Sequence, residues 1–293
     1  MTDRPVPRLD HVVIGTDFGE PSRAAVSWVA RQLAPEARLT LVHALGDTRP
    51  PMLGEPRPLP TEAEMEAARA RATMRLREME GELPGHPVQV VVGDDRAEWV
   101  IAEVAESSGA DLVVVGPHGE EHSRRSRLGS TAERLIRMSP VHVLMADAPP
   151  HARPRHILVP VDYVDLTPAV LDWARLLAAR SGADVTLLHA ATGDEEDKGA
   201  GAWLEAMTGD LPGSTRAELI PTTRSPGEEI LDAAERLGAD LIVMGRRGRG
   251  RALPGVLGST VSDVLRGAGR PVLVVVDPRD AILDDWETTT EAA

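Results

Sequence analysis

An internal repeat constrains the fold of this chain more than any other feature, because one pattern of strands and helices occurs twice. "HVVIGTDFGEPSRAAVSWVARQLAPEARLTLVHAL" begins at His11, and "HILVPVDYVDLTPAVLDWARLLAARSGADVTLLHAA" begins at His156. Each copy reads as an apolar strand that ends in Asp, an amphipathic helix, and a second apolar strand that ends in His-Ala. A chain of 293 residues is long enough for two such units, each with its own core.

The repeat continues to the end of each half. "EWVIAEVAESSGADLVVVGPHG" matches "EEILDAAERLGADLIVMGRRG", and "LGSTAERLIRMSPVHVLMA" matches "LGSTVSDVLRGAGRPVLVV". Asp17 and Asp162 are 145 residues apart, whereas Gly116 and Gly245 are 129 apart. The interval between equivalent residues becomes shorter between the second and third strands, so the first half has extra residues at that point. They form a proline-rich loop and a charged helix from Glu62 to Glu80, where the second half has a loop and a short helix.

The apolar strands, such as "LVVVG", "LIVMG" and "PVLVVV", lack strict alternation, which is typical of parallel strands covered by helices on both faces. We therefore expect an α/β fold with two tandem Rossmann-like domains, each a doubly wound, five-stranded parallel sheet. The predicted domains span residues 1–148 and 154–278. They are followed by an acidic tail at 279–293 that we expect to be mobile.

The last strands of the two halves, "VHVLMA" and "PVLVVV", would be sheet edges, and an exposed edge strand invites pairing. Pairing them with each other would make an intramolecular pseudo-dimer about an approximate two-fold axis. Further homodimerisation stays open.

Composition excludes several function classes. The chain has no cysteine, which excludes disulfides, thiolate metal sites and cysteine nucleophiles, and Lys198 is its only lysine. A net charge of -14 argues against a nucleic-acid partner. No apolar run is long enough for a signal peptide or a membrane span, so we expect a cytoplasmic protein without a membrane partner.

Special residues fall where this topology predicts a ligand. In doubly wound sheets, ligands bind beyond the carboxyl ends of the strands, at the crevice between the first and fourth strands. Asp17 and Asp162 follow the first strands. Either carboxylate can bind a ribose hydroxyl or a purine amine, or it can belong to the turn that starts the next helix. Because an Asp occurs at this place in both halves, the ligand-binding interpretation is favoured over the turn.

The loops after the fourth strands share one spacing: Gly-x-x-Gly, nine residues, then Gly-Ser-Thr at the start of a helix. Their members are Gly116, Gly119, Gly129, Ser130 and Thr131, and in the second half Gly245, Gly248, Gly258, Ser259 and Thr260. Glycines let the backbone approach a ligand closely, and a helix N-terminus is a ready phosphate site. In a purely structural interpretation, Ser130 with Glu133 and Thr260 with Asp263 form capping boxes. Neither loop is a Walker A or dinucleotide motif.

This pattern, G-2x-G-9x-G-[ST] with Asp after the first strand and His-Ala after the second, resembles the universal stress protein family over nearly the whole chain. The resemblance implies a tandem member of that family. It implies that the motif glycines and hydroxyls wrap the ribose and phosphates of ATP. It also implies that Asp17, Ala44, Asp162 and Ala190 hold the ribose and adenine side, and that family members dimerise through the last strand.

The two loops differ in charge. The first has Pro117, which would stiffen it, and Glu120 and Glu121, which would repel phosphate, although arginines follow. The second carries four arginines suited to a triphosphate: Arg246, Arg247, Arg249 and Arg251. We therefore predict that the second site binds ATP at least as tightly as the first.

We expect an ATP-binding stress-response or regulatory module with one adenine-nucleotide site per domain, with Mg²⁺ as a companion of ATP and an unidentified protein partner. No nucleophile–base pair or metal-ligand spacing recurs in both halves, so no catalytic residue is assigned and at most slow ATP hydrolysis is expected. We interpret His43 and His189 as structural and Trp28 and Trp173 as core. The alternatives are an ATPase or nucleotidyl-transfer enzyme, an interaction protein with vestigial sites, and a nucleic-acid binder. The acidic charge and scarce aromatic residues count against the last.

Overall fold

The computed structural model describes residues 6–46, 60–117, 128–146, 152–162, 167–191, 199–209, 211–247 and 256–277. The predicted acidic tail at 279–293 lies outside these ranges. The first half contains β1 (His11–Gly15), α1 (Glu20–Trp28) continued by a short π-helical segment (Val29–Leu33), β2 (Arg38–Ala44), α2 (Glu62–Gly81), β3 (Val88–Gly93), α3 (Ala97–Ser107), β4 (Leu112–Val115), α4 (Ser130–Met138) and β5 (His142–Met145). The second half contains β6 (His156–Pro160), α5 (Thr167–Ser181), β7 (Asp184–Ala191), α6 (Ala200–Thr208), β8 (Thr215–Pro221), α7 (Pro226–Arg236), β9 (Leu241–Gly245), α8 (Ser259–Gly267) and β10 (Val272–Val275).

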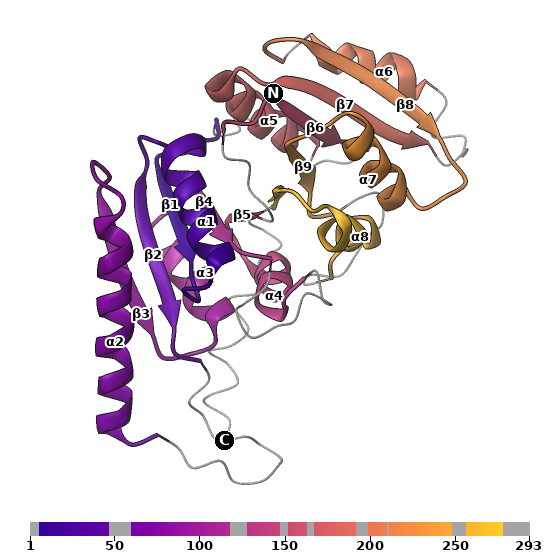
Figure 1. Cartoon of the computed structure of the whole chain (residues 1–293). Helices are drawn as coiled ribbons and strands as arrows, with labels where there is room; N and C mark the ends of the chain where they lie inside the picture. Colours follow the sequence, from indigo (N-terminus) through magenta and orange to yellow (C-terminus); the bar gives the residue numbers. More distant parts are fainter. Residues whose placement is uncertain are drawn as a thin grey trace, which may run out of the picture.

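The strands form one ten-stranded sheet in the order β3-β2-β1-β4-β5-β10-β9-β6-β7-β8 (Figure 1). Within each half the neighbours are parallel, and β1 lies next to β4 as β6 lies next to β9. Only the junction of the halves is antiparallel: β5 pairs with β10, with Leu144 opposite Leu273. These two leucines are equivalent in the repeat, so the approximate two-fold axis passes through this pair. The predicted α/β fold and the pseudo-dimer through the last strands are confirmed.

Apart from the partly exposed edge strands β3 and β8, the strands are largely buried on both faces, which explains why they do not alternate between apolar and polar residues. Val12 and Ile14 pack into the cluster that contains α1, α2, α5 and α6, whereas Val13 packs into the cluster of α3, α4, α7 and α8. Each face of the sheet therefore has one apolar layer that runs through both halves. Trp28 and Trp173 are buried in the first of these layers, as predicted.

The extra segment of the first half contains α2, which starts and ends within one residue of the predicted charged helix. A capping box between Thr61 and Glu64 begins this helix, because each residue's side chain bonds the other's backbone amide. In the second half the equivalent position holds the shorter α6. No helix of the described residues is long and apolar enough to cross a membrane.

The amino ends of the strands carry a duplicated polar cluster. His11 Nε2 lies 2.9 Å from Thr40 Oγ1, and Asp111 Oδ2 accepts a hydrogen bond from the His11 amide at 2.9 Å. In the second half the same contacts join His156 to Thr186 at 2.8 Å, and to Asp240 at 3.0 Å. Because these residues bond one another, this cluster stabilises the sheet end opposite the predicted ligand crevice.

Candidate functional site

A cavity lies in each half where the carboxyl ends of the first and fourth strands meet. Its volume is about 170 Å³ in the first half and about 210 Å³ in the second. The walls of the two cavities correspond position by position: Asp17 and Asp162, His43 and His189, Ala44 and Ala190, Ile101 and Ile230, Gly116 and Gly245, Thr131 and Thr260. The two cavities are therefore copies of one site, in the crevice that the topology predicts.

Most of the predicted site residues line these cavities. In the first half they are Asp17, Ala44, Gly116, Gly129, Ser130 and Thr131. In the second half they are Asp162, Ala190, Gly245 and Thr260. Gly258 and Ser259 stand at the start of α8 but are not among the residues that line the second cavity. Gly119 and Gly248 lie outside the described residues.

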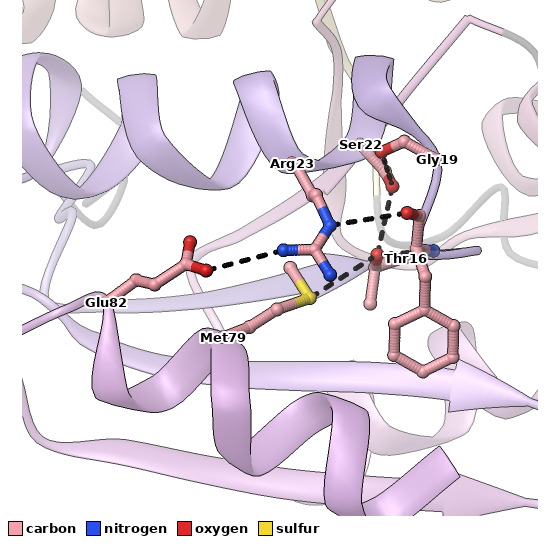
Figure 2. Close-up of polar contacts among 7 residues, drawn as sticks. Thr16, Gly19, Ser22, Arg23, Met79 and Glu82 are labelled. Atoms are coloured by element: carbon pink, nitrogen blue, oxygen red, sulfur yellow. Dashed lines mark hydrogen bonds and ion pairs between the residues drawn. The ribbon is translucent and has the colours of Figure 1, made fainter. Parts of the chain in front are cut away.

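The turn after β1 is held by a network of hydroxyl groups around Asp17. Asp17 Oδ1 accepts hydrogen bonds from the Gly19 amide at 3.0 Å and from the Ser22 hydroxyl at 2.8 Å. The Thr16 hydroxyl lies 2.9 Å from the Ser22 hydroxyl and also donates to the Met79 sulfur at 4.0 Å (Figure 2). Asp17 thus serves the turn and faces the cavity at once, which combines the two interpretations that the sequence left open.

Phe18 gives this turn its shape. Its φ of 68° lies in the left-handed region, which is rare for a residue other than glycine and strains the backbone. Three contacts hold it there: its amide donates to Thr16 Oγ1 at 3.0 Å, Arg23 Nε donates to its carbonyl at 3.3 Å, and its ring lies 4.3 Å from that of His43. Arg23 also pairs with Glu82 beyond the end of α2 (Figure 2). The extra helix of the first half therefore braces the strained turn that presents Asp17.

His43 and His189 have the same structural role in the two halves. The His43 ring lies with Nδ1 2.8 Å from the carbonyl of Thr16, and His189 Nδ1 lies 2.8 Å from the carbonyl of Val161. Burial lowers the pKa of His43, so its ring is neutral and Nδ1–H donates this bond. Each histidine ties the end of the second strand to the residue before the site Asp. Among the described residues, no group of three or more His, Asp or Glu side chains could hold a metal ion.

The helices that border the cavities begin without a side-chain cap, and the predicted capping boxes are wrong. Gly129 and Gly258 are the N-cap residues of α4 and α8, and neither helix has a side-chain hydrogen bond at its cap. Ser130 is consequently the first helical residue of α4 and Thr260 the second of α8, so both stand too late in the chain to cap. The N–H groups of each first turn and the positive end of the helix dipole remain for a ligand.

Neither N-cap needs to be glycine for the sake of the backbone. Gly129 has φ -77° and Gly258 has φ -60°, values that any residue adopts. By contrast, Gly109 and Gly238 of the duplicated Gly-Ala-Asp turns both have φ 61°, which favours glycine. Gly116, Gly129 and Gly245 of the motif line the cavities, whereas the glycines of the turns satisfy a backbone conformation.

The residue after the first motif glycine differs between the halves. In the first half, the Pro117 carbonyl accepts a hydrogen bond from the Gly129 amide at 2.6 Å and so closes its own loop. In the second half, Arg246 is only 1% exposed and does not face the cavity. The interpretation of Arg246 as a triphosphate ligand is therefore wrong. Arg247 lines the second cavity, and Arg249 and Arg251 lie outside the described residues.

A family model for universal stress proteins matches residues 8–147 and 154–276. The chain belongs to the universal stress protein family. A universal stress protein from Mycolicibacterium smegmatis is 27% identical over 291 residues, covering 90% of this chain and 96% of the relative. The crystal structure of a universal stress protein from Archaeoglobus fulgidus covers 92% of this chain and 99% of its own, with a TM-score of 0.75 and 18% identity, which supports the fold.

A second universal stress protein structure from Archaeoglobus fulgidus was solved in complex with dAMP. It is 26% identical, covers 41% of this chain and 96% of its own, and has a TM-score of 0.34. The full-length matches, together with the repeat, make this chain a tandem universal stress protein.

Sequence reasoning missed two groups of site residues in this universal stress protein. Thr16 and Ser22 were missed because serine and threonine are common in turns, and only the structure shows them bonded around Asp17. The residues at the start of α3 and α7 were missed because they belong to neither motif. Ile101 and Ile230 occupy the same place in the repeat and line the two cavities, so the repeat itself could have identified them.

Proposed function

We propose that this tandem universal stress protein binds one adenine nucleotide in each half, with ATP as the ligand, and serves as a nucleotide-dependent regulatory module. The observation that carries the proposal is the first cavity. Residues from three separate stretches of chain, predicted from the repeated pattern and the family resemblance, line it together: Asp17, Ala44, Gly116, Gly129, Ser130 and Thr131.

The chemistry of the walls fits the parts of a nucleotide. Apolar side chains such as Val42 and Ile101 offer a surface for a base, and the backbone next to Ala44 can bond its polar edge. The Asp17 carboxylate can accept a bond from a ribose hydroxyl. The uncapped start of α4 suits phosphates, and Gly129 leaves room for them. Mg²⁺ would be held mainly by the phosphates of ATP, as is usual for this cation. The cysteine-free chain fits the reducing cytoplasm, which is the compartment we propose.

The test uses Gly129→Val and Gly258→Val, which place a side chain at the start of α4 or α8 without straining the backbone. Isothermal titration with ATP and Mg²⁺ should give two sites in the natural protein, one in each variant and none in the double variant. Gly81→Val is the matched control, because a Cβ at Gly81, the last residue of α2, meets nothing within 4 Å. This control should keep both sites.

The same samples separate the alternatives. Mass spectrometry of the purified protein should find adenine nucleotide, and incubation with ATP and Mg²⁺ should give product no faster than about one turnover per hour. Rapid turnover that Gly129→Val or Gly258→Val abolishes would make the protein an enzyme. Absence of any bound nucleotide or titration heat would favour an interaction protein with vestigial sites.

A further inference from the structure

Arg246 connects the two halves at one point. It follows β9 directly, between Gly245 and Arg247, which both line the second cavity. The Arg246 side chain does not line that cavity but is buried and enters the first half. There its Nη1 donates to the carbonyls of Ile136, Arg137 and Ser139 at 3.4, 3.2 and 3.1 Å.

These carbonyls are the C-terminal end of α4. The last carbonyls of a helix have no partner within it, and the helix dipole makes this end negative. The buried guanidinium therefore supplies donors to these carbonyls and adds a buried positive charge at the negative end of α4. The opposite end of the same helix holds Ser130 and Thr131, which line the first cavity. One short helix thus has the first site at its N-terminus and a residue of the second site's loop at its C-terminus.

In the second half, the described contacts at the equivalent helix end come from the same half. The counterpart of α4 is α8, and the carbonyl of Ala268 at its end accepts from Arg270 Nε at 2.9 Å. Arg270 belongs to the same half and also bonds the carbonyls of Ala234 and Ala239. The position of Arg246 is taken by Pro117 in the first half, which has no side-chain donor. The helix of each site therefore has an arginine at its C-terminal end, which for α4 comes from the other half and for α8 from the same half.

We propose that Arg246 is a positioning residue that couples the two sites, so that occupation of the second site strengthens binding at the first. This inference rests on the proposed nucleotide binding. A ligand against Gly245 and Arg247 restrains the backbone on both sides of Arg246, which fixes the guanidinium against α4 and orders that helix. A helix ordered in advance loses less conformational entropy when it binds phosphate, which is positive coupling. Linkage requires the first site to strengthen the second by the same factor.

The test measures ATP affinity at the first site with the second site open or blocked by Gly258→Val. With Arg246 present, we expect filling of the second site to tighten the first about 5-fold. In Arg246→Met this ratio should fall to about 1, and Arg246→Lys should restore part of it. Arg270→Met is the matched control, because it removes an arginine cap of α8 and should leave the ratio unchanged. A purely structural role would weaken the first site equally whether the second is open or blocked.

Hydrogen exchange in nucleotide-free protein tests whether Arg246 orders the C-terminal end of α4. Amides at the end of α4 should exchange at least about 10-fold faster in Arg246→Met, while those of α8 should not, and Arg270→Met should give the reverse. The coupling is overturned if the ratio survives in Arg246→Met, or if the natural protein binds at two independent sites. If α4 loosens as expected but neither natural site binds ATP, the proposed function itself is wrong.

Discussion

The two glycine loops share every glycine of their motif, yet the residue after the first glycine has a different role in each. Pro117 closes its own loop through the Gly129 amide, whereas Arg246 leaves its loop and supports α4 of the other half. The sequence favoured the arginine as a phosphate ligand because it stands in a glycine-rich, basic stretch. The difference teaches that charge near a binding motif indicates a ligand only where the side chain faces the site.

Of the substitutions considered below, Arg246→Met should lower the stability of the chain most. Arg246→Met leaves the carbonyls at the end of α4 without donors in a buried place, so the free energy of unfolding should fall by about 3 kcal/mol. Pro117→Ala, at the equivalent position, should change it by less than about 1 kcal/mol. Urea unfolding followed by tryptophan fluorescence measures both. Equal losses in the two variants would mean that the halves use this position alike.

The junction strands provide the next comparison, because β5 has His142 where the second half has Pro271. Burial lowers the pKa of His142 to about 4, and its Nδ1 accepts a hydrogen bond from the Val276 amide at 3.1 Å. The unfolded chain, with an ordinary histidine pKa near 6.5, binds more protons between these values. The contribution of His142 to stability is therefore complete above pH 6.5 and is lost as the pH falls towards 4.

Between pH 7 and pH 4.5 this loss should amount to roughly 2 to 3 kcal/mol. His142→Asn keeps an acceptor without titrating, so it should remove that part of the pH dependence. The lowered pKa values of His11 and His43 add a component that persists in the variant. Urea unfolding at a series of pH values gives the two curves, and identical curves would contradict the assignment.

At the second site, Arg247 is the arginine that we expect to meet a ligand, since it lines the cavity. In a Gly129→Val background, Arg247→Ala should weaken ATP binding about 10-fold, and AMP binding less, because a charge-assisted bond to a phosphate is lost. Arg236→Ala removes the same charge from an exposed place in this half and is the control. A similar loss from both variants would show only a general effect of net charge.

The last comparison concerns the turn after the first strand, which differs between the halves. Thr16→Val removes the acceptor of the Phe18 amide and should lower the free energy of unfolding by about 1.5 kcal/mol. The second half already has Val161 at this position, so the change itself fits the fold. Thermal denaturation measures it, and an unchanged midpoint would mean that the hydroxyl network is dispensable.

The repeat predicted the fold because parallel strands and their helices leave local marks in the sequence. The continuous apolar runs, the Gly-Ala-Asp turns and the equal spacings located the strands of both halves and placed Asp17, Gly116 and Gly129 at one crevice. The domain boundaries at 148 and 154 stay predictions. What could not be predicted depends on contacts between residues far apart, such as Arg246 with Ser139, 107 positions away. Duplication alone was also ambiguous, because His11 and Asp111 recur as faithfully as the site residues and lie at the opposite end of the sheet.

The capping boxes failed for a local reason. A hydroxyl residue after glycine fits the sequence pattern of a cap, but α4 begins one residue, and α8 two residues, earlier than caps at Ser130 and Thr260 require. A shift of one residue turns a capping hydroxyl into a helical residue beside the cavity. Sequence patterns place helix ends less sharply than this, so they could not separate a capping serine from one that lines the cavity.

The antiparallel junction of β5 and β10 also has a consequence for how such a molecule can diverge. In a dimer of identical chains, every substitution appears in both subunits. An arginine that contacts the other subunit would therefore always be accompanied by the symmetric contact in the opposite direction. Joining the halves in one chain removes that restriction, because Leu144 and Leu273 can mutate separately and each half always meets the same neighbour. The molecule keeps the geometry of a symmetric pair while its two members are free to specialise.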